Sequence, residues 1–210
     1  MKKSDRPGFF IAFEGLDGSG SAHHAAALAR ILERDGYRVV LSHEPTNSMI
    51  GGLIRSRLAG EWEIAPETLQ LLFTADRAEH LAKKILPALV AGRVVICDRY
   101  ILSALAYNVV LVNDPEWLRN LNARFIEPHL TFYIQVNAKL CARRRKEARF
   151  ELDLRIEEKK LLQVEKEYNR HADMMDSIYS INGERDDVAI IDEILEITRK
   201  HLERHPVDTS

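Results

Sequence analysis

The sequence predicts an α/β fold in which five parallel strands form one sheet with helices on both faces. Short apolar segments rich in aromatic and branched residues alternate with longer segments of helical periodicity along the chain. A glycine-rich turn separates the first strand from the first helix, and polar residues follow directly after the next strands. Alternation of this kind is typical of a parallel sheet whose connecting helices cover both of its faces.

The strands are expected at 9–14, 38–43, 93–97, 130–136 and 177–182. The helices are expected at 23–35, 48–58, 66–82, a further segment ending at 91, then 101–110, 117–125, 140–158, 159–175 and one from 187. Ser48 precedes its helix as an N-cap, Pro66 begins the next one, and Gly36 and Gly92 follow helix ends. Residues 205–210 are expected to form a loose tail.

Length and composition limit the class of protein. With 210 residues, 46% hydrophobic and 30% charged, the chain suits a single globular domain over residues 1–210. The formal net charge of -2 gives no support to a nucleic-acid partner. No apolar stretch approaches the ~18 residues that a membrane span needs. Cys97 and Cys141 form neither a disulfide framework nor a metal motif, so we expect a cytoplasmic protein without a membrane partner.

The turn after the first strand fits the spacing of a phosphate-binding P-loop, which reads Gly, four residues, Gly, Lys, then Ser or Thr. Ser21 and Ala22 stand where the lysine and the magnesium-binding hydroxyl are expected. Backbone N–H groups and the helix start can still hold an anion without the lysine. The alternative is a tight strand-to-helix turn with no ligand. The residues expected to contact a phosphate are Gly15, Leu16, Asp17, Gly18, Ser19, Gly20 and Ser21.

Other polar residues also lie just beyond a strand end. Glu44 follows the second expected strand, and Asp98 and Arg99 follow the third. Ligands of open parallel sheets bind outside the carboxyl ends of the strands. We therefore expect these residues and the glycine-rich turn to converge on one cleft.

The stretch Phe13-Glu14-Gly15-Leu16-Asp17-Gly18-Ser19-Gly20 resembles the opening of the thymidylate kinase family. Further motifs of that family follow in its order: Glu44-Pro45, Phe73 with Arg77, Asp98-Arg99-Tyr100, Ser103 and Ala106-Tyr107-Asn108. The similarity runs from about residue 9 to about residue 202. It implies a nucleoside monophosphate kinase fold of the P-loop NTP hydrolase type, ATP and Mg²⁺ as cofactors, dTMP as substrate and a homodimer.

The resemblance also implies roles for single residues. Phe73 would stack on the thymine ring, Arg77 would hydrogen-bond its edge, and Arg99 would grip the monophosphate. Asp98 would lie near the magnesium ion. The other residues implied to contact the substrate are Glu44, Ser103, Tyr107 and Asn108. Without the resemblance, Phe73 could equally pack in the core, and Arg77 and Arg99 could form surface ion pairs.

The basic segment at about 141–158 falls where the family has its mobile lid. Family members without an arginine in the P-loop place their catalytic arginines in that lid, and this loop has none. The resemblance therefore implies catalytic roles for Arg145 and Arg149, together with Asp98. A run of charges is also typical of a solvated helix face.

Departures from the family pattern fall mostly on the ATP and metal side. His43 stands at the position of the arginine in the family's Arg-Glu-Pro-Gly motif. Ala148 replaces an aspartate of the lid, and Gln135 replaces an aspartate of the fourth strand. His23 and His24 have neither the reach nor the permanent charge of lysine. We favour a protein that binds dTMP but phosphorylates it to dTDP poorly. The alternatives are an active kinase that uses the loop backbone and lid arginines, and a non-catalytic scaffold.

Overall fold

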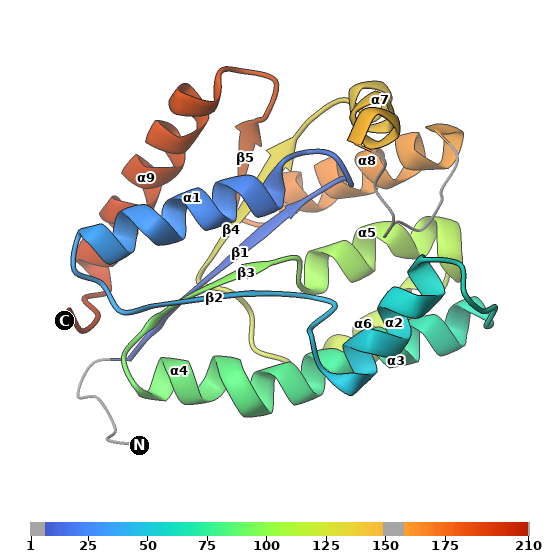
Figure 1. Cartoon of the computed structure of the whole chain (residues 1–210), viewed down its shortest axis with the longest axis horizontal. Coiled ribbons are helices and arrows are strands. Elements are labelled where there is room, and N and C mark those ends of the chain that lie inside the picture. The colour runs from blue at the N-terminus through green and yellow to red at the C-terminus, as the bar shows by residue number, and fades with distance from the viewer. Residues whose placement is uncertain (1–6, 149–157, 210) are drawn as a thin grey trace.

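The computed structural model describes residues 7–148 and 158–209. Five strands form one sheet in the order β2-β3-β1-β4-β5, and every neighbouring pair is parallel. They are β1 (Phe9–Gly15), β2 (Val39–His43), β3 (Val94–Asp98), β4 (Leu130–Gln135) and β5 (Ile178–Asn182). The predicted fold class is confirmed (Figure 1).

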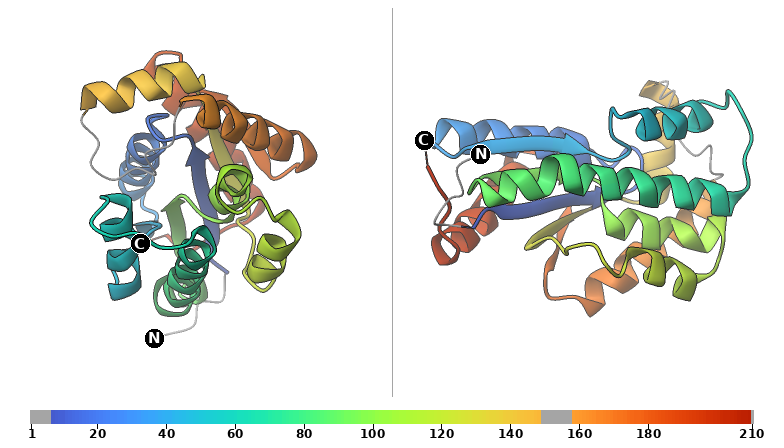
Figure 2. Two further views of the ribbon diagram at one scale, coloured as in Figure 1. Left: turned by 90° about the vertical axis from the view of Figure 1, so that its right-hand side faces the viewer. Right: turned by 90° about the horizontal axis from the view of Figure 1, so that it is seen from below.

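The helices occupy the connections between these strands. They are α1 (Ser21–Arg34), α2 (Met49–Leu58), α3 (Pro66–His80), the π-helical segment η1 (Leu81–Ile85), α4 (Leu86–Val90), α5 (Ile101–Leu111), α6 (Pro115–Asn122), α7 (Ala138–Ala148), α8 (Glu158–Met174) and α9 (Asp187–Arg204). The segments α3, η1 and α4 follow one another without a break and form one long helix (Figure 2). Within the described ranges, no helix has the length and apolar character to cross a membrane.

The sheet is covered on both faces. Helices α1 and α9 lie on one side of it, and α4 lies on the other (Figure 1). Successive side chains of a strand point to opposite faces. Phe9 and Phe13 therefore join the core with α1, whereas Phe10 and Ala12 pack with Ile85 of η1. Burial on both faces explains why the first strand reads as a continuous apolar run.

Several helix boundaries differ from the predicted ones for local reasons. Helix α1 begins at Ser21 rather than residue 23, directly after Gly20, whose φ is 91°. Helix α6 begins at Pro115 rather than residue 117, because the Asp114 carboxylate caps it by accepting from the Trp117 N–H at 3.0 Å. The helix expected over 140–158 is present as α7 up to Ala148, and residues 149–157 lie outside the described ranges.

The expectation of a loose C-terminal tail is wrong for residues 205–209. Val207 is buried in the main core cluster. Thr209 forms an antiparallel bridge with Tyr37, and Asp208 accepts a hydrogen bond from Arg38 at 2.8 Å. One buried apolar side chain, one backbone bridge and one ion pair between side chains therefore hold this segment beside the start of β2.

Candidate active site

The strand ends converge as the sequence predicts. Phe13, His43 and Asp98 lie level with one another in the sheet register. Beyond them the Arg99 N–H donates to the Phe13 carbonyl at 2.7 Å, and the Glu44 N–H donates to the Asp98 carbonyl at 3.0 Å. Continued backbone pairing thus fixes the polar residues that follow β2 and β3 at one edge of the sheet.

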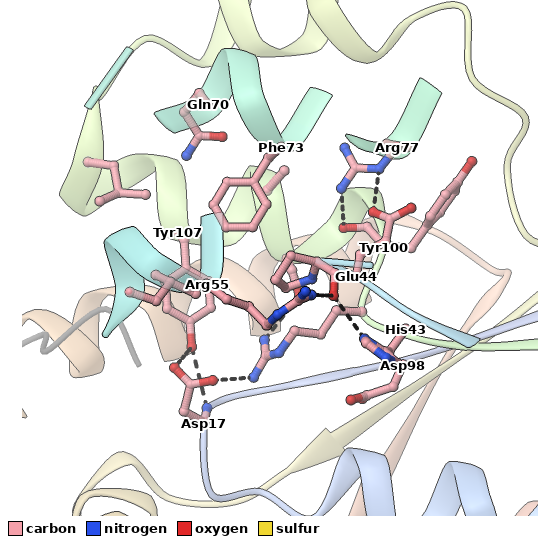
Figure 3. Close-up of a pocket in the computed structure, with 16 residues that line it drawn as sticks. Asp17, His43, Glu44, Arg55, Gln70, Phe73, Arg77, Asp98, Tyr100 and Tyr107 are labelled. Carbon is pink, nitrogen blue, oxygen red and sulfur yellow. Dashed lines mark hydrogen bonds and ion pairs between the residues drawn. The ribbon is translucent and has the colours of Figure 1, made fainter. Parts of the chain in front are cut away.

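A pocket opens at this edge, between the strand ends and helices α2, α3 and α5 (Figure 3). Its lining contains eight of the residues singled out from the sequence: Asp17, Glu44, Phe73, Arg77, Asp98, Arg99, Ser103 and Tyr107. The lining also contains two polar residues that sequence reasoning did not single out, Arg55 and Gln70. Residues from five separate segments of the chain, the glycine-rich loop, the turn after β2, α2, α3 and the stretch from the end of β3 through α5, therefore meet in one cavity.

Arg77 reaches the pocket from α3 and is held in a buried ion pair. Its Nε donates to Glu44 Oε2 at 2.9 Å, and its Nη2 donates to the Tyr100 carbonyl at 3.0 Å. Another donor, Nη1, contacts Asn122 Oδ1 at 2.5 Å. Since both charged side chains are almost fully buried, the alternative reading of Arg77 as a surface ion pair is wrong.

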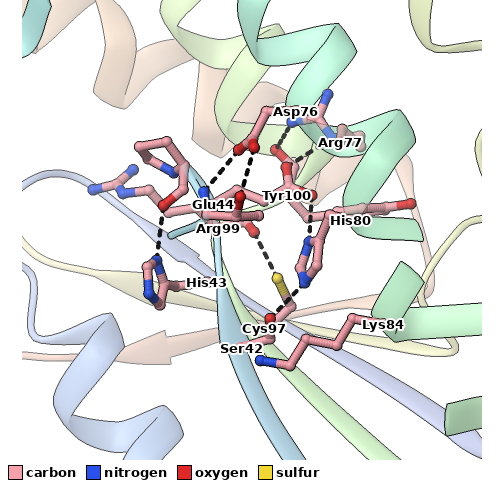
Figure 4. Close-up of polar contacts among 12 residues, drawn as sticks. Ser42, His43, Glu44, Asp76, Arg77, His80, Lys84, Cys97, Arg99 and Tyr100 are labelled. Carbon is pink, nitrogen blue, oxygen red and sulfur yellow. Dashed lines mark hydrogen bonds and ion pairs between the residues drawn. The ribbon is translucent and has the colours of Figure 1, made fainter. Parts of the chain in front are cut away.

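Glu44 is held from its other side by His80. The His80 Nδ1 lies 3.0 Å from Glu44 Oε1, and its Nε2 lies 2.5 Å from Ser42 Oγ (Figure 4). Next to this network, Asp76 accepts hydrogen bonds from the Thr46 N–H at 2.7 Å and the Thr46 hydroxyl at 2.6 Å. These contacts order the turn after β2 and leave Glu44 little freedom to rotate.

Arg99 connects the glycine-rich loop with α5. Its backbone has a φ of 65°, and its Nη1 donates to the Gly15 carbonyl at 2.9 Å and to Ser103 Oγ at 3.1 Å. Its Nη2 donates to Asp17 Oδ1 at 2.6 Å. Tyr107 donates to the other oxygen of the same carboxylate at 3.1 Å (Figure 3). The guanidinium is thus oriented by three neighbours before any ligand arrives.

The glycine-rich loop retains the backbone shape of an anion site. Gly18 and Gly20 have φ values of 92° and 91°, a conformation that side chains with a Cβ rarely adopt. The Ser19 hydroxyl is buried, and within the described residues it has no hydrogen-bond partner. Successive N–H groups at a helix start form a site for phosphate oxygens.

A hydroxyl and a carboxylate meet where this loop faces β3. Ser21 Oγ donates to Asp98 Oδ1 at 2.7 Å. Burial raises the pKa of Asp98, although the charge of Arg99 and the Ser21 hydrogen bond oppose that effect. Both groups offer oxygen ligands, the type that Mg²⁺ prefers, so the residues present fit this ion. Ala22 lacks the hydroxyl expected from the motif, but Ser21 places one beside Asp98.

Two arginines of α7 approach the loop. Arg144 Nη1 donates to the Gly18 carbonyl at 3.4 Å. A Cβ built on Gly18 would lie 2.8 Å from the Cys141 carbonyl and 3.4 Å from Arg145 Cγ, so α7 packs directly on the loop. Arg149, predicted to be catalytic, lies outside the described residues.

The two histidines at the start of α1 differ in environment. His23 is exposed and His24 is buried, and their Nε2 atoms lie 3.7 Å and 4.0 Å from carboxylate oxygens of Asp187. Burial and the neighbouring His23 lower the pKa of His24. His24 is therefore neutral near pH 7 and does not replace the positive charge of the missing lysine.

One of the residues predicted to contact the substrate lies elsewhere, and two polar residues of the pocket escaped sequence reasoning. Asn108 is buried but borders a separate cavity beside Arg119, so it does not line the pocket of Figure 3. Arg55 projects from α2, and its contact with the Thr46 carbonyl holds it against the strand end. The helical spacing of Gln70 before Phe73 was the signal that could have identified Gln70.

Comparison with known proteins agrees with this geometry. The family model described as thymidylate kinase matches residues 13–194. The thymidylate kinase of Brachyspira hyodysenteriae is 34% identical over 204 residues, which cover 96% of this chain and 98% of that protein. A probable thymidylate kinase of Thermococcus gammatolerans is 38% identical over 187 residues, covering 84% and 89%. A probable thymidylate kinase of Pyrococcus horikoshii is 45% identical over 142 residues, covering 65% and 69%. The chain belongs to the thymidylate kinase family.

Proposed function

We propose that this chain binds dTMP in the pocket of Figure 3 and transfers a phosphoryl group to it from ATP only slowly. One observation carries the proposal: the pocket is lined by three arginines, whereas the residue at the lysine position of the glycine-rich loop is a serine. The half of the site that would bind the phosphoryl acceptor therefore contains positively charged side chains. The half that would bind the triphosphate lacks the positive charge of the P-loop lysine.

The acceptor half offers a surface for each part of a nucleoside monophosphate. The ring of Phe73 faces the pocket and can stack on a base. The guanidinium groups of Arg55 and Arg99 line the pocket and supply positive charge for the phosphate. Because Arg99 is already oriented by Asp17 and Gly15, its donors are placed before binding, which lowers the entropic cost of binding.

The donor half would act through backbone groups and one oxygen pair. The N–H groups of residues 15–21 would hold the phosphates of ATP, and Ser21 with Asp98 would hold Mg²⁺. When bound, this ion neutralises charge on the phosphates during transfer. Removal of one preorganised donor at a transition state typically costs roughly 10²–10³ in rate. The absence of the lysine is therefore expected to slow transfer by at least that factor.

A second function, an active dTMP kinase, is favoured by one contact. Arg144 donates to the Gly18 carbonyl, and Arg145 lies against the same glycine. Arginines that reach the transferring group from outside the loop are worth roughly 10³–10⁵ in rate. In this reading the arginines of α7 take over the task of the lysine.

A paired titration and a turnover assay test the proposal. Calorimetry with dTMP should show micromolar binding, and an assay coupled to diphosphate formation should show turnover far below the ~1–100 per second of ordinary kinases. Turnover within that range would support the second function instead. If neither dTMP nor ATP–Mg²⁺ binds, a non-catalytic scaffold is favoured. The homodimer that the family resemblance implies and the cytoplasmic location that the cysteine usage suggests are further proposals, and light scattering of the purified chain tests the first.

A further inference from the structure

Two histidines and an aspartate converge beside the glycine-rich loop, in a cluster that the proposed function does not use. His23 and His24 lie in the first turn of α1, and Asp187 is the first residue of α9. One possible ligand atom from each of these three side chains lies within 4.8 Å of the other two. Helices α1 and α9 pack against each other on the same side of the sheet (Figure 1). The fold therefore fixes the two helix starts relative to one another.

The distances in this cluster suit a shared metal ion better than direct hydrogen bonds. The Nε2 atoms of His23 and His24 lie 3.7 Å and 4.0 Å from carboxylate oxygens of Asp187, which is too long for a hydrogen bond. Ligand atoms around a tetrahedral Zn²⁺ lie about 3.3–3.5 Å apart, because each bond to the metal is about 2.0–2.2 Å long. Side-chain rotations that move each atom by less than about 1 Å would therefore bring all three atoms to one ion.

The types of ligand in the cluster select the class of metal. Two imidazole nitrogens and one carboxylate oxygen suit Zn²⁺ and similar transition metals, whereas Mg²⁺ and Ca²⁺ prefer oxygen ligands. Three protein ligands leave the fourth tetrahedral position to a water molecule. The cluster therefore differs in selectivity from the oxygen pair of Ser21 and Asp98, which suits Mg²⁺.

Burial gives the cluster one fixed ligand and two accessible ones. The side chain of His24 is 4% exposed, whereas those of His23 and Asp187 are 60% and 73% exposed. An ion can thus enter from solvent and meet a ligand that the core already holds in place. The charge of Arg144 and the positive ends of α1 and α9 oppose a cation here, but helix-end effects are weak and screened at exposed sites.

A second cluster meets the same distance limit but suits a metal less well. Glu44, His80 and Cys97 also bring their ligand atoms within 4.8 Å of one another, and all three are buried. Both ring nitrogens of His80 already contact Glu44 and Ser42, and Glu44 is paired with Arg77. A metal ion would have to break these buried contacts, and it would have no open path from solvent.

We infer that His23, His24 and Asp187 bind Zn²⁺ or a similar divalent transition metal, which joins the start of α1 to the start of α9. A Cβ built on Gly20 would lie 3.6 Å from the His24 side-chain nitrogen. The ion therefore lies beside the last glycine of the loop whose lysine is missing, and it adds positive charge there. The inference goes beyond the proposed function, because no nucleotide takes part in the site.

Titration of the full chain, without an affinity tag or nucleotide, with Zn²⁺ against a chromophoric chelator tests the inference. The wild-type chain should bind one equivalent of Zn²⁺ with micromolar or tighter affinity. His23→Gln and Asp187→Asn should each weaken binding at least about 10-fold, because each removes one of three ligands. His205→Gln and Asp192→Asn change exposed residues elsewhere on the chain and are the matched controls. Both should bind Zn²⁺ as the wild type does.

Thermal unfolding and cobalt spectra provide two further measurements. Zn²⁺ at 100 times its Kd should raise the Tm of the wild-type chain by roughly 5–10 °C. At the same Zn²⁺ concentration, the rise for Asp187→Asn should be about half as large or smaller. Co²⁺ bound at the cluster should show no thiolate charge-transfer band, and Cys97→Ser should bind Zn²⁺ as tightly as the wild type.

Three outcomes would overturn the inference. The first is a wild-type chain that binds no stoichiometric Zn²⁺, and the second is equal affinity in His23→Gln, Asp187→Asn and their controls. The third is loss of binding in Cys97→Ser, which would place the metal in the buried cluster. Circular dichroism shows whether the variants are folded. If they are not, the wild-type Co²⁺ spectrum decides: a thiolate band overturns the inference, and bound Co²⁺ without that band supports it.

Discussion

Ser21 Oγ donates a hydrogen bond to Asp98 Oδ1 at 2.7 Å and so links the first residue of α1 to the last residue of β3. The motif spacing identifies Ser21 only as a missing lysine. In the fold, the same side chain brings a hydroxyl to the carboxylate that the family resemblance places near magnesium. The loop has therefore lost a cation while keeping an oxygen pair suited to Mg²⁺.

This contact predicts that a lysine introduced at position 21 does not by itself restore full turnover. Ser21→Lys adds the charge but removes the hydroxyl from Asp98, whereas Ala22, an exposed residue, is the motif position where a hydroxyl can be added back. The double variant Ser21→Lys with Ala22→Ser should raise kcat by about 10²-fold or more, and Ser21→Lys alone should raise it less. A coupled diphosphate assay measures both. Equal turnover of the two variants would show that the hydroxyl does not matter, and dTMP affinity should stay unchanged in both.

Arg55 should contribute to phosphate affinity and not to base affinity. Arg55→Leu removes a cation from the pocket, so we expect dTMP to bind roughly 10–100-fold more weakly, as for the loss of a charge-assisted hydrogen bond. Binding of thymidine, which has no phosphate, should change little. Arg57 lies two residues further along α2, pairs with Glu63 at 3.4 Å and does not line the pocket. Calorimetry with Arg57→Leu is therefore the matched control, and equal losses in the two variants would contradict the assignment.

The arginines of α7 distinguish slow transfer from an active kinase. If they replace the lysine, Arg145→Ala should lower turnover roughly 10³–10⁵-fold. Arg143 is the control, since it is 70% exposed and lies 3.8 Å from Glu147 on the same helix. Single-turnover assays with labelled ATP measure both variants. Turnover that is indifferent to Arg145→Ala would argue against the active kinase and leave slow transfer as the better reading.

Features that depend on local sequence patterns were predictable here. The five strands, the alternation with helices and the convergence of Glu44, Asp98 and Arg99 follow from periodicity and from the topology of parallel sheets. The direction of a side chain within a helix was less predictable. Asn108 follows Tyr107 on α5 yet faces another cavity, because neighbouring helical residues point in directions about 100° apart.

Contacts between distant segments could not be predicted from the sequence either. The network of Ser42, His80 and Glu44 joins residues from β2 to the end of α3, and no spacing rule connects them. Val207 is buried because it packs in the main core cluster, whose other residues come from distant parts of the chain. Packing of this kind is set by the tertiary structure, so composition and periodicity carry little information about it.

The ion pair of Glu44 and Arg77 should be as important for stability as for binding. Both side chains are at most 3% exposed, and removal of one partner leaves a buried charge without compensation. Arg77→Met should therefore lower the free energy of unfolding by about 3–5 kcal/mol, as measured by urea denaturation. The double variant Arg77→Met with Glu44→Gln should recover part of this loss. Urea denaturation of Glu44→Gln alone completes the comparison. If the loss of unfolding free energy in the double variant equals the sum of the losses in the two single variants, the two residues are not coupled.

The stability of the chain should decrease as the pH falls below about 6.5, in part because of His129. The His129 Nδ1 accepts the Phe10 N–H at 2.9 Å, and its ring stacks on Phe9. Burial, followed by the nearby His205, lowers the pKa of His129 from the ordinary value of 6.5. Between that lowered pKa and 6.5 the unfolded chain binds more protons than the native chain. Stability is therefore complete above 6.5 and is lost as the pH falls through this window, by up to about 1.4 kcal/mol per pH unit.

His129→Asn isolates this contribution, because asparagine does not titrate and its side-chain oxygen can still accept the Phe10 N–H. Other groups with shifted pKa values, such as Asp98 and His24, contribute equally to both chains and cancel in the comparison. Urea denaturation at pH 7.5 and pH 5.5 should show a smaller loss of stability for the variant than for the wild type. An identical loss in both chains would mean that His129 is protonated in the native state as readily as in the unfolded one.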